Sequence, residues 1–230
     1  MFYWDPTIII LIPGLILAFW AQAKVNSTFQ RYLRVDSRKG YSGAQVAREL
    51  LKANSVNDVN VEMVSGHLSD HYDPRSKVIR LSPQVYQGTS VAAVGVAAHE
   101  TGHALQHNQE YFPLAIRNSL VPVANFGSNM AFPLFFIGLL FQSNLGLTLM
   151  NLGILLFTAA LLFQVMTLPV ELNASNRAIT MLTGQGILDL GEEGAARKVL
   201  TAAAWTYVAA VAVAALQLLR LLLIRGQRDD

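Results

Sequence analysis

The sequence predicts an integral membrane protein that is mostly α-helical and carries one small α+β domain. Two observations predict this class. Apolar residues make up 53% of the 230 positions and charged residues only 14%, against about 25% charged in a typical soluble domain. The charges are also unevenly placed, because no charged side chain occurs between Arg117 and Glu171 or from Val199 to Leu219.

About four transmembrane helices are expected. The first apolar run, residues 6–23, is just long enough to cross a bilayer. A signal peptide is the alternative for this run, but Asp5 precedes it and Lys24 follows it, which is the wrong order of charges. Residues 120–168 predict a hairpin of two spans, because a polar break separates two long apolar runs. Residues 199–224 predict the fourth span.

Residues 25–117 hold most of the charge and are expected to fold as the small soluble domain. Ser42 is placed to cap a helix through residues 44–51, where the apolar side chains form one stripe. Strand-like segments follow this helix. A turn with Pro74 in its second position then predicts a β-hairpin, which leads into the segment from Lys77 to Ser82.

A second helix of this domain, residues 90–107, contains His99-Glu100-Thr101-Gly102-His103. Residues four apart lie on one face of a helix, so His99 and His103 can hold one metal ion with Glu100 beside it. Neutral imidazoles are good zinc ligands, and the adjacent carboxylate can take a proton from water. A chance match on an amphipathic helix is the alternative. The chain has no cysteine, so a third ligand must be His, Asp or Glu.

Glu171 is the candidate for the third ligand. Two membrane crossings return the chain to the side that it left, so residues 169–198, expected as a helix and a linker, lie again beside the histidines. A glutamate that merely marks the end of a span is the alternative. His107 is excluded as a ligand, because three histidines at steps of four span about 12 Å along a helix.

Four segments of the chain resemble the bacterial YugP-type neutral zinc metallopeptidases of the membrane. These segments are Leu68-Ser-Asp-His-Tyr-Asp-Pro, Val96-Ala-Ala-His-Glu-Thr-Gly-His-Ala-Leu-Gln-His, Leu168-Pro-Val-Glu-Leu-Asn-Ala-Ser and Val199-Leu-Thr-Ala-Ala-Ala. The resemblance implies a zincin-like soluble domain, one Zn²⁺ per chain and peptide hydrolysis. More distantly, the plan is similar to HtpX and the CAAX prenyl proteases, in which an aspartate follows the glutamate ligand by four residues. Ser175 takes that place here, and it can accept a hydrogen bond from a ligand histidine only as a neutral group.

Further site residues are less sharply defined by the pattern. Ser175, Asn173, Arg177 and His71 are candidates for supporting the ligands or stabilising an oxyanion, and an ordinary structural role is the alternative for each. The strand before the histidine helix is a candidate edge strand that binds substrate through its main chain, with a plain hairpin strand as the alternative. Its residues are Lys77, Val78, Ile79, Arg80 and Leu81.

Together, the residues predict a membrane-embedded zinc endopeptidase that acts on peptide or membrane-protein substrates. A metal-binding scaffold or inactive protease is the alternative, and Glu100 disfavours it because a structural site needs no base. A transporter is disfavoured because residues 120–168 carry no ionisable group. The scattered net charge of +2 disfavours nucleic acid. A homo-oligomer or a regulatory membrane partner is compatible with the sequence.

The protein is expected to be a multi-pass protein of the cell membrane with its active site on the cytoplasmic side. Of the 17 Lys and Arg residues, 14 precede the fourth span and belong to the side that holds the soluble domain. The other three, Arg220, Arg225 and Arg228, follow or end that span. They leave the side of the C-terminus open, because four crossings from an outside N-terminus would place them outside.

Overall fold

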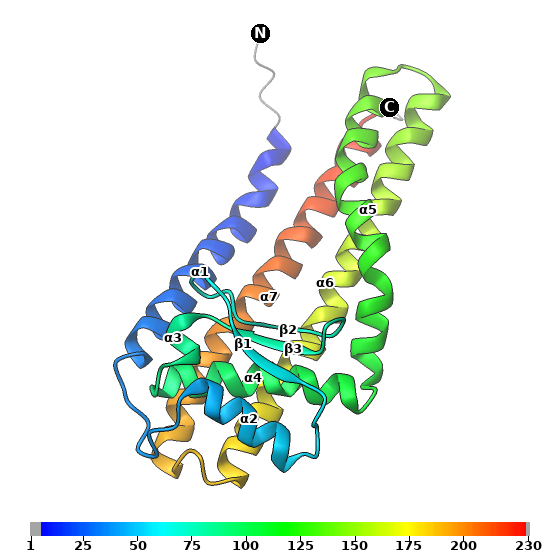
Figure 1. The fold of residues 1–230 in the computed structure, drawn as a ribbon. Helices are drawn as coiled ribbons and strands as arrows, with labels where there is room; N and C mark the ends of the chain where they lie inside the picture. Colours follow the sequence, from blue (N-terminus) through cyan, green and yellow to red (C-terminus); the bar gives the residue numbers. More distant parts are fainter. Residues whose placement is uncertain (1–5, 229–230) are drawn as a thin grey trace. The chain divides into compact units, whose positions relative to one another are not determined.

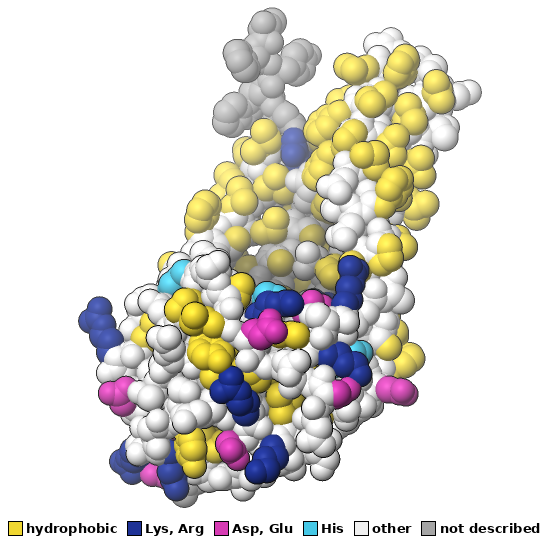
Figure 2. Space-filling model, in the orientation of Figure 1, with side chains coloured by type: hydrophobic (Ala, Val, Ile, Leu, Met, Phe, Trp, Pro, Cys, Tyr) yellow, Lys and Arg dark blue, Asp and Glu magenta, His cyan; other side chains and the backbone are white. Residues whose placement is uncertain are grey.

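The computed structural model describes residues 6–228, which belong to two compact units (Figure 1). We call one the helical unit, formed within that range by Met1–Ala21, Ile116–Leu168 and Thr206–Asp230. We call the other the mixed unit, formed by Gln22–Ala115 and Pro169–Trp205, which holds the β-sheet. On the face shown in Figure 2, charged side chains gather over the mixed unit and hydrophobic ones over the helical unit.

Four helices in the described part of the chain are long and apolar enough to cross a membrane. They are α1 (Ile12–Tyr32, preceded by the 3-10 turn η1, Pro6–Leu11), α5 (Phe112–Leu140), α6 (Asn144–Gly184) and α7 (Leu190–Gly226). The prediction of a mostly helical membrane protein with about four spans and a small sheet is confirmed. Helices α6 and α7 extend well beyond their apolar runs, so only residues 185–189 separate them.

In the helical unit, α5, α6 and α7 share a buried core that includes Phe135, Met150 and Leu221. The guanidinium of Arg228 donates hydrogen bonds to the carbonyl oxygens of Gly138 and Phe141, both at 2.6 Å. The last carbonyls of a helix have no partner within it, and a cation is favourable there. Arg228 therefore has a structural role at the end of α5, besides any role in membrane topology.

The mixed unit contains a three-stranded sheet, with β1 (Asn60–Met63), β2 (His71–Asp73) and β3 (Val78–Leu81) in the order β1-β3-β2. Strands β2 and β3 pair antiparallel, which confirms the predicted hairpin, whereas β1 and β3 pair parallel. The prediction that residues 77–81 form an edge strand was wrong, because β3 is the central strand and both of its edges are occupied. Within residues 6–228, the unpaired edges of the sheet belong to β1 and β2.

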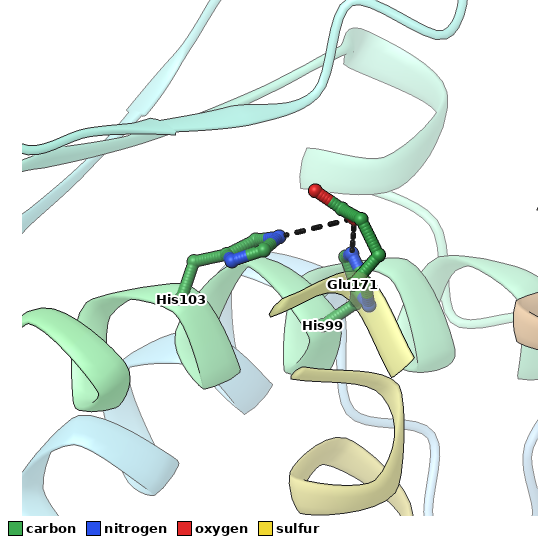
Figure 3. Close-up of side chains that lie close together, drawn as sticks. All are labelled: His99, His103 and Glu171. Atoms are coloured by element: carbon green, nitrogen blue, oxygen red, sulfur yellow. Dashed lines mark hydrogen bonds and ion pairs between the residues drawn. The ribbon is translucent and has the colours of Figure 1, made fainter. Parts of the chain in front are cut away.

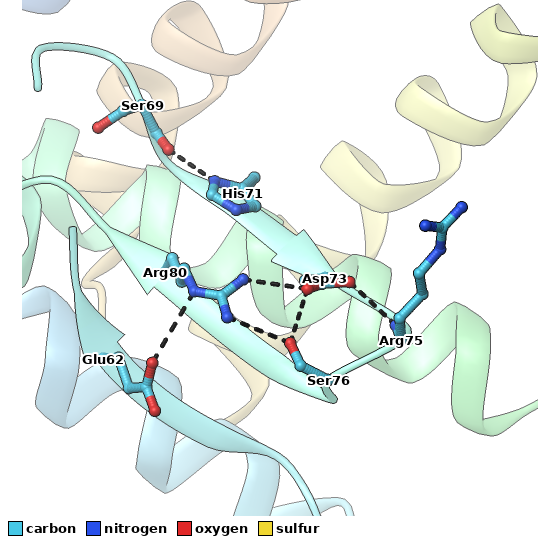
Figure 4. A network of polar contacts seen from close by, with 7 residues as sticks. All are labelled: Glu62, Ser69, His71, Asp73, Arg75, Ser76 and Arg80. Carbon is cyan, nitrogen blue, oxygen red and sulfur yellow. Dashed lines mark hydrogen bonds and ion pairs between the residues drawn. The ribbon is translucent and has the colours of Figure 1, made fainter. Parts of the chain in front are cut away.

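The pattern within β3 explains this correction. Val78, Ile79 and Leu81 are all buried, and a strand with apolar residues on both faces is typical of a sheet interior. The fourth residue, Arg80, reaches both neighbouring strands: its guanidinium bonds to Asp73 of β2 at 3.1 Å and approaches Glu62 of β1 at 3.8 Å (Figure 4). Because carboxylates on both neighbouring strands neutralise its charge, Arg80 can occupy a central strand.

Asp73, at the end of β2, organises the hairpin turn. Its carboxylate accepts hydrogen bonds from the Ser76 hydroxyl, the Arg75 backbone N–H and the Arg80 guanidinium. These donors, the Ser76 hydroxyl foremost, hold the pKa of the Asp73 carboxyl below its usual range. The turn between β2 and β3 is therefore built around an ionised carboxylate.

Helix α4 (Val91–Asn108) lies at the centre of the mixed unit. Ser90 caps it by accepting a hydrogen bond from the Ala93 N–H. Helices α2 (Gly43–Ala53) and α3 (Pro83–Tyr86) and the sheet all pack against α4. Helix α2 begins at the predicted cap, because Ser42 and Gln45 form a reciprocal capping box. Burial of α4 by these elements keeps its histidine-bearing turns in a fixed place.

The segment of α6 from Pro169 onwards packs against α4 within the mixed unit. Ala178 and Leu182 of α6 share a buried cluster with Val94 and Ala98 of α4. The two backbones approach closely at Gly102, where an added Cβ would lie 2.7 Å from the carbonyl oxygen of Ala174. The predicted third-ligand segment is therefore not a separate helix but the continuation of α6, with Pro169 inside it.

Candidate metal centre

Three side chains from α4 and α6 point toward one another (Figure 3). His99 and His103 lie one turn apart on α4, and Glu171 lies on α6. The Oε2 atom of Glu171 is 3.3 Å from Nε2 of His99 and 3.4 Å from Nε2 of His103. One ligand atom from each residue lies within 4.8 Å of the others, so the three can hold a metal ion.

The spacing of these atoms fits zinc. A tetrahedral zinc ion with ligands at about 2.0–2.1 Å holds each pair of ligand atoms about 3.3–3.4 Å apart. The two distances from Glu171 to the histidines have these values, and the ligand atoms of the two histidines lie within 4.8 Å of each other. Two imidazoles and a carboxylate are also the donor set of many catalytic zinc sites, which keep a fourth position open. The residues present therefore fit a zinc ion.

Both histidines have an oxygen at the ring nitrogen that faces away from Glu171. The Nδ1 atom of His99 is 3.1 Å from the hydroxyl oxygen of Ser175, and Nδ1 of His103 is 3.0 Å from the amide oxygen of Gln106. When each Nδ1–H donates to its oxygen, each Nε2 keeps its lone pair for a metal. Ser175 thus lies within hydrogen-bond distance of His99, and its role in supporting a ligand stays a prediction.

Gln106 connects His103 to α6 through hydrogen bonds. Its side chain is fully buried, and its amide nitrogen donates to the carbonyl oxygen of Val170 and to Oδ1 of Asn173, both at 2.9 Å. Asn173 also accepts a hydrogen bond from Nε of Arg177 at 2.7 Å. A chain of polar contacts therefore runs from Arg177 through Asn173 and Gln106 to Nδ1 of His103, the ring nitrogen that faces away from Glu171.

Sequence reasoning did not single out Gln106. The available signal was its position three residues after His103, which places it on the same face of the helix. Asn173 and Arg177 were named from the sequence, and hydrogen bonds connect them to His103 through Gln106. The fourth named residue is His71, the first residue of β2. Its Nδ1 atom bonds to the carbonyl oxygen of Ser69, two residues before it. No hydrogen bond joins it to the three clustered residues in the described structure.

Glu100 follows the first histidine, and only 8% of it is exposed. Burial raises the pKa of its carboxyl above the usual range, and the neighbouring imidazoles of His99 and His103 only partly oppose this. A carboxylate is suited to exchanging protons near neutral pH when its pKa is raised in this way. Glu100 is therefore a buried carboxyl beside the ligand candidates, with its pKa shifted toward neutral pH.

The negative charge of Glu171 acts on the histidines as well. Burial lowers the pKa of His103, but the hydrogen bond and charge of Glu171 outweigh this effect, and the pKa is raised overall. A site that favours a proton on an imidazole favours a divalent cation for the same electrostatic reason. His107, excluded as a ligand, instead bonds through Nδ1 to the hydroxyl of Tyr72 at 2.8 Å.

The four apolar helices and the His-His-Glu cluster define a membrane protein with a candidate metal-hydrolase centre. Residues 7–226 match the model of a family described as "Putative neutral zinc metallopeptidase". The chain is also 49% identical over 217 residues to the "Putative membrane protease YugP" of Bacillus subtilis (strain 168), covering 94% of this chain and 95% of the relative. The chain therefore belongs to this family of neutral zinc metallopeptidases. No solved structure matches it.

Proposed function

We propose that the protein is a zinc endopeptidase of the two-histidine, one-glutamate type, with His99, His103 and Glu171 as ligands and Glu100 as the base. The convergence of one carboxylate oxygen on two imidazole nitrogens at 3.3 and 3.4 Å carries this proposal. When bound, zinc supplies a Lewis acid that lowers the pKa of water and polarises the scissile carbonyl.

The chain's own residues do the remaining work. Glu100 accepts the proton of the attacking water and passes it to the leaving amine. Its burial keeps this proton exchange away from bulk solvent. Ser175 and Gln106 fix the rings of the ligand histidines by accepting their Nδ1–H bonds. The base and the ligands are therefore held in place before a substrate arrives.

A peptide substrate can add to the free edge of β2, residues His71–Asp73. This strand packs against α4, and its other edge is paired with β3. Main-chain hydrogen bonds to an added strand hold a peptide with little selection of its side chains. Because the chain belongs in a membrane, we propose membrane proteins and their juxtamembrane segments as the substrates.

Zinc analysis of three variants, with casein cleavage measured alongside, tests the assignment. Glu100→Gln should retain zinc and lose cleavage, because it removes the base but no ligand. Glu171→Ala should lose both. Glu49→Gln, an exposed glutamate of α2, is the matched control and should change neither. Full activity in Glu100→Gln would contradict the assignment of Glu100 as the base. A zinc-loaded wild type without any peptidase activity would indicate a metal-binding scaffold instead of an enzyme.

We also propose that the mixed unit faces the cytoplasm. The basic residues that precede the fourth span support this side. The chain has no cysteine, so single cysteines can be introduced at the exposed positions Asn57, in the mixed unit, and Ser143, between α5 and α6. In intact cells, a membrane-impermeant maleimide should label Ser143→Cys and spare Asn57→Cys. The opposite labelling pattern would show that the mixed unit lies on the outer side of the membrane.

A further inference from the structure

A hollow in the mixed unit is lined by cations. It has a volume of about 610 Å³ and lies between the last turns of α1 and the first turns of α7. Four basic side chains and two aromatic ones line it, namely Lys24, Arg31, Arg197, Lys198, Tyr32 and Trp205. Ligand sites of small molecules occupy about 300–1,000 Å³. The hollow is therefore large enough for a small polar group.

The positive charge in this hollow is largely uncompensated. None of the ten described residues that line it is acidic. Arg197 pairs with Glu193 at 2.8 Å, but within residues 6–228 no carboxylate lies within ion-pair distance of Lys24, Arg31 or Lys198. The guanidinium of Arg31 lies over the ring of its neighbour, 5.6 Å from the centroid. Like charges gathered without counterions favour an anionic ligand.

The hollow also lies where both helices leave their apolar runs. On α1, Lys24 is the first charged residue after the run of residues 6–23. On α7, Lys198 is the last charged residue before the run from Val199 to Leu219. Trp205, on the second of these helices, is 39% exposed, and tryptophan is enriched at the boundary between headgroups and hydrocarbon. We therefore expect the cations at headgroup level.

We propose that this hollow binds the phosphate of an anionic phospholipid headgroup. Lysine and arginine make charge-assisted hydrogen bonds to phosphate oxygens, and basic pockets between membrane helices bind acidic headgroups. The hydroxyls of Thr28 and Thr201, which also line the hollow, are further donors. The site shares no residue with the metal centre, so it is independent of the proposed peptidase function.

Native mass spectrometry of the full chain, released from micelles with equal amounts of phosphatidylglycerol and phosphatidylcholine, tests this proposal. Wild type should retain phosphatidylglycerol in preference. The double variant Lys24→Gln/Lys198→Gln should bind it roughly 30-fold more weakly, since each basic residue near a membrane surface contributes about 1 kcal/mol. Neither lysine has an ion pair in the described structure, so the substitutions break none of its salt bridges.

The control is Lys39→Gln/Lys52→Gln, which removes the same charge from two exposed lysines that line a different hollow. It should retain the lipid as wild type does, and both double variants should keep the wild-type zinc content and helicity. Equal retention of the two lipids, or equal loss in both double variants, would overturn the proposal. Full displacement of the lipid by millimolar inorganic phosphate would assign the site to free phosphate instead.

Discussion

Replacing Gln106 by methionine separates metal positioning from catalysis. Methionine has nearly the shape of glutamine, so little cavity is created, but it removes the acceptor for Nδ1–H of His103 and two donated hydrogen bonds. We expect zinc to bind about 10–100-fold more weakly, which is the usual effect of losing a partner of a metal-ligating histidine. This corresponds to about 1.4–2.7 kcal/mol.

The metal-free protein should also lose stability. Asn173 keeps a partner, because the Nε atom of Arg177 still donates to it. The cost therefore falls on the imidazole N–H of His103, which is left without its acceptor, and on the Val170 carbonyl oxygen, which loses one donor. An unsatisfied buried donor costs about 1–3 kcal/mol. Thermal unfolding of the metal-free variant should show a loss in this range.

Zinc affinity is measured by competition with a chromogenic chelator, and cleavage is measured at saturating zinc. A residue that only positions His103 should lose affinity but recover most of its cleavage rate when zinc is in excess. Gln109→Met is the control, because Gln109 is exposed and bonds to Arg177 rather than to a ligand. Wild-type zinc affinity in Gln106→Met would refute the reasoning.

Three further predictions concern the same unit. Ser175→Ala should weaken zinc binding up to about tenfold and Ser175→Asp should strengthen it, because a carboxylate is a stronger acceptor for the ligand imidazole; chelator competition measures both. Gly102→Ala should destabilise the fold by about 1–3 kcal/mol, measured by thermal unfolding, because its Cβ would lie 2.7 Å from a backbone oxygen of α6. The ionised Asp73 carboxylate stabilises the fold at pH values above the ordinary pKa of aspartate. This stabilisation is lost as the pH falls through the lowered pKa of Asp73. As the pH is lowered from about 4, the melting temperature of Asp73→Asn should therefore fall less than that of wild type.

Each of these predictions has an internal comparison. Gly95→Ala is the control for the α4 glycine, because its nearest neighbour would be 3.8 Å away, an ordinary contact. If both alanine variants melt alike, close approach of the helices is not the reason for glycine. Equal zinc affinity in the two Ser175 variants would show that Ser175 does not support His99. An unchanged acid profile in Asp73→Asn would show that the hairpin carboxylate does not govern acid stability.

Local signals in the sequence predicted most of the elements. The predicted cap at Ser42 lies where its side-chain oxygen bonds to a free N–H group in the first turn of α2. The apolar runs predicted the spans because bilayer thickness fixes their length. The parallel pairing of β1 with β3 was missed, since it joins strands separated by another strand and is decided by tertiary packing. The edge assigned to residues 77–81 was wrong for that reason.

The same distinction between local and tertiary signals applies to the metal centre. The spacing of His99 and His103 is local, and the pattern predicted it. Their partners depend on how closely α6 approaches α4, and that approach is set by a residue inside the motif, Gly102. Its missing side chain lets the backbone of Ala174 come within contact distance. Ala174 lies on the face of α6 that carries Glu171, one turn away, so a larger residue at position 102 would move the carboxylate from its ligand distance. The second variable position of the motif is therefore a structural condition for the position of Glu171, the proposed third ligand.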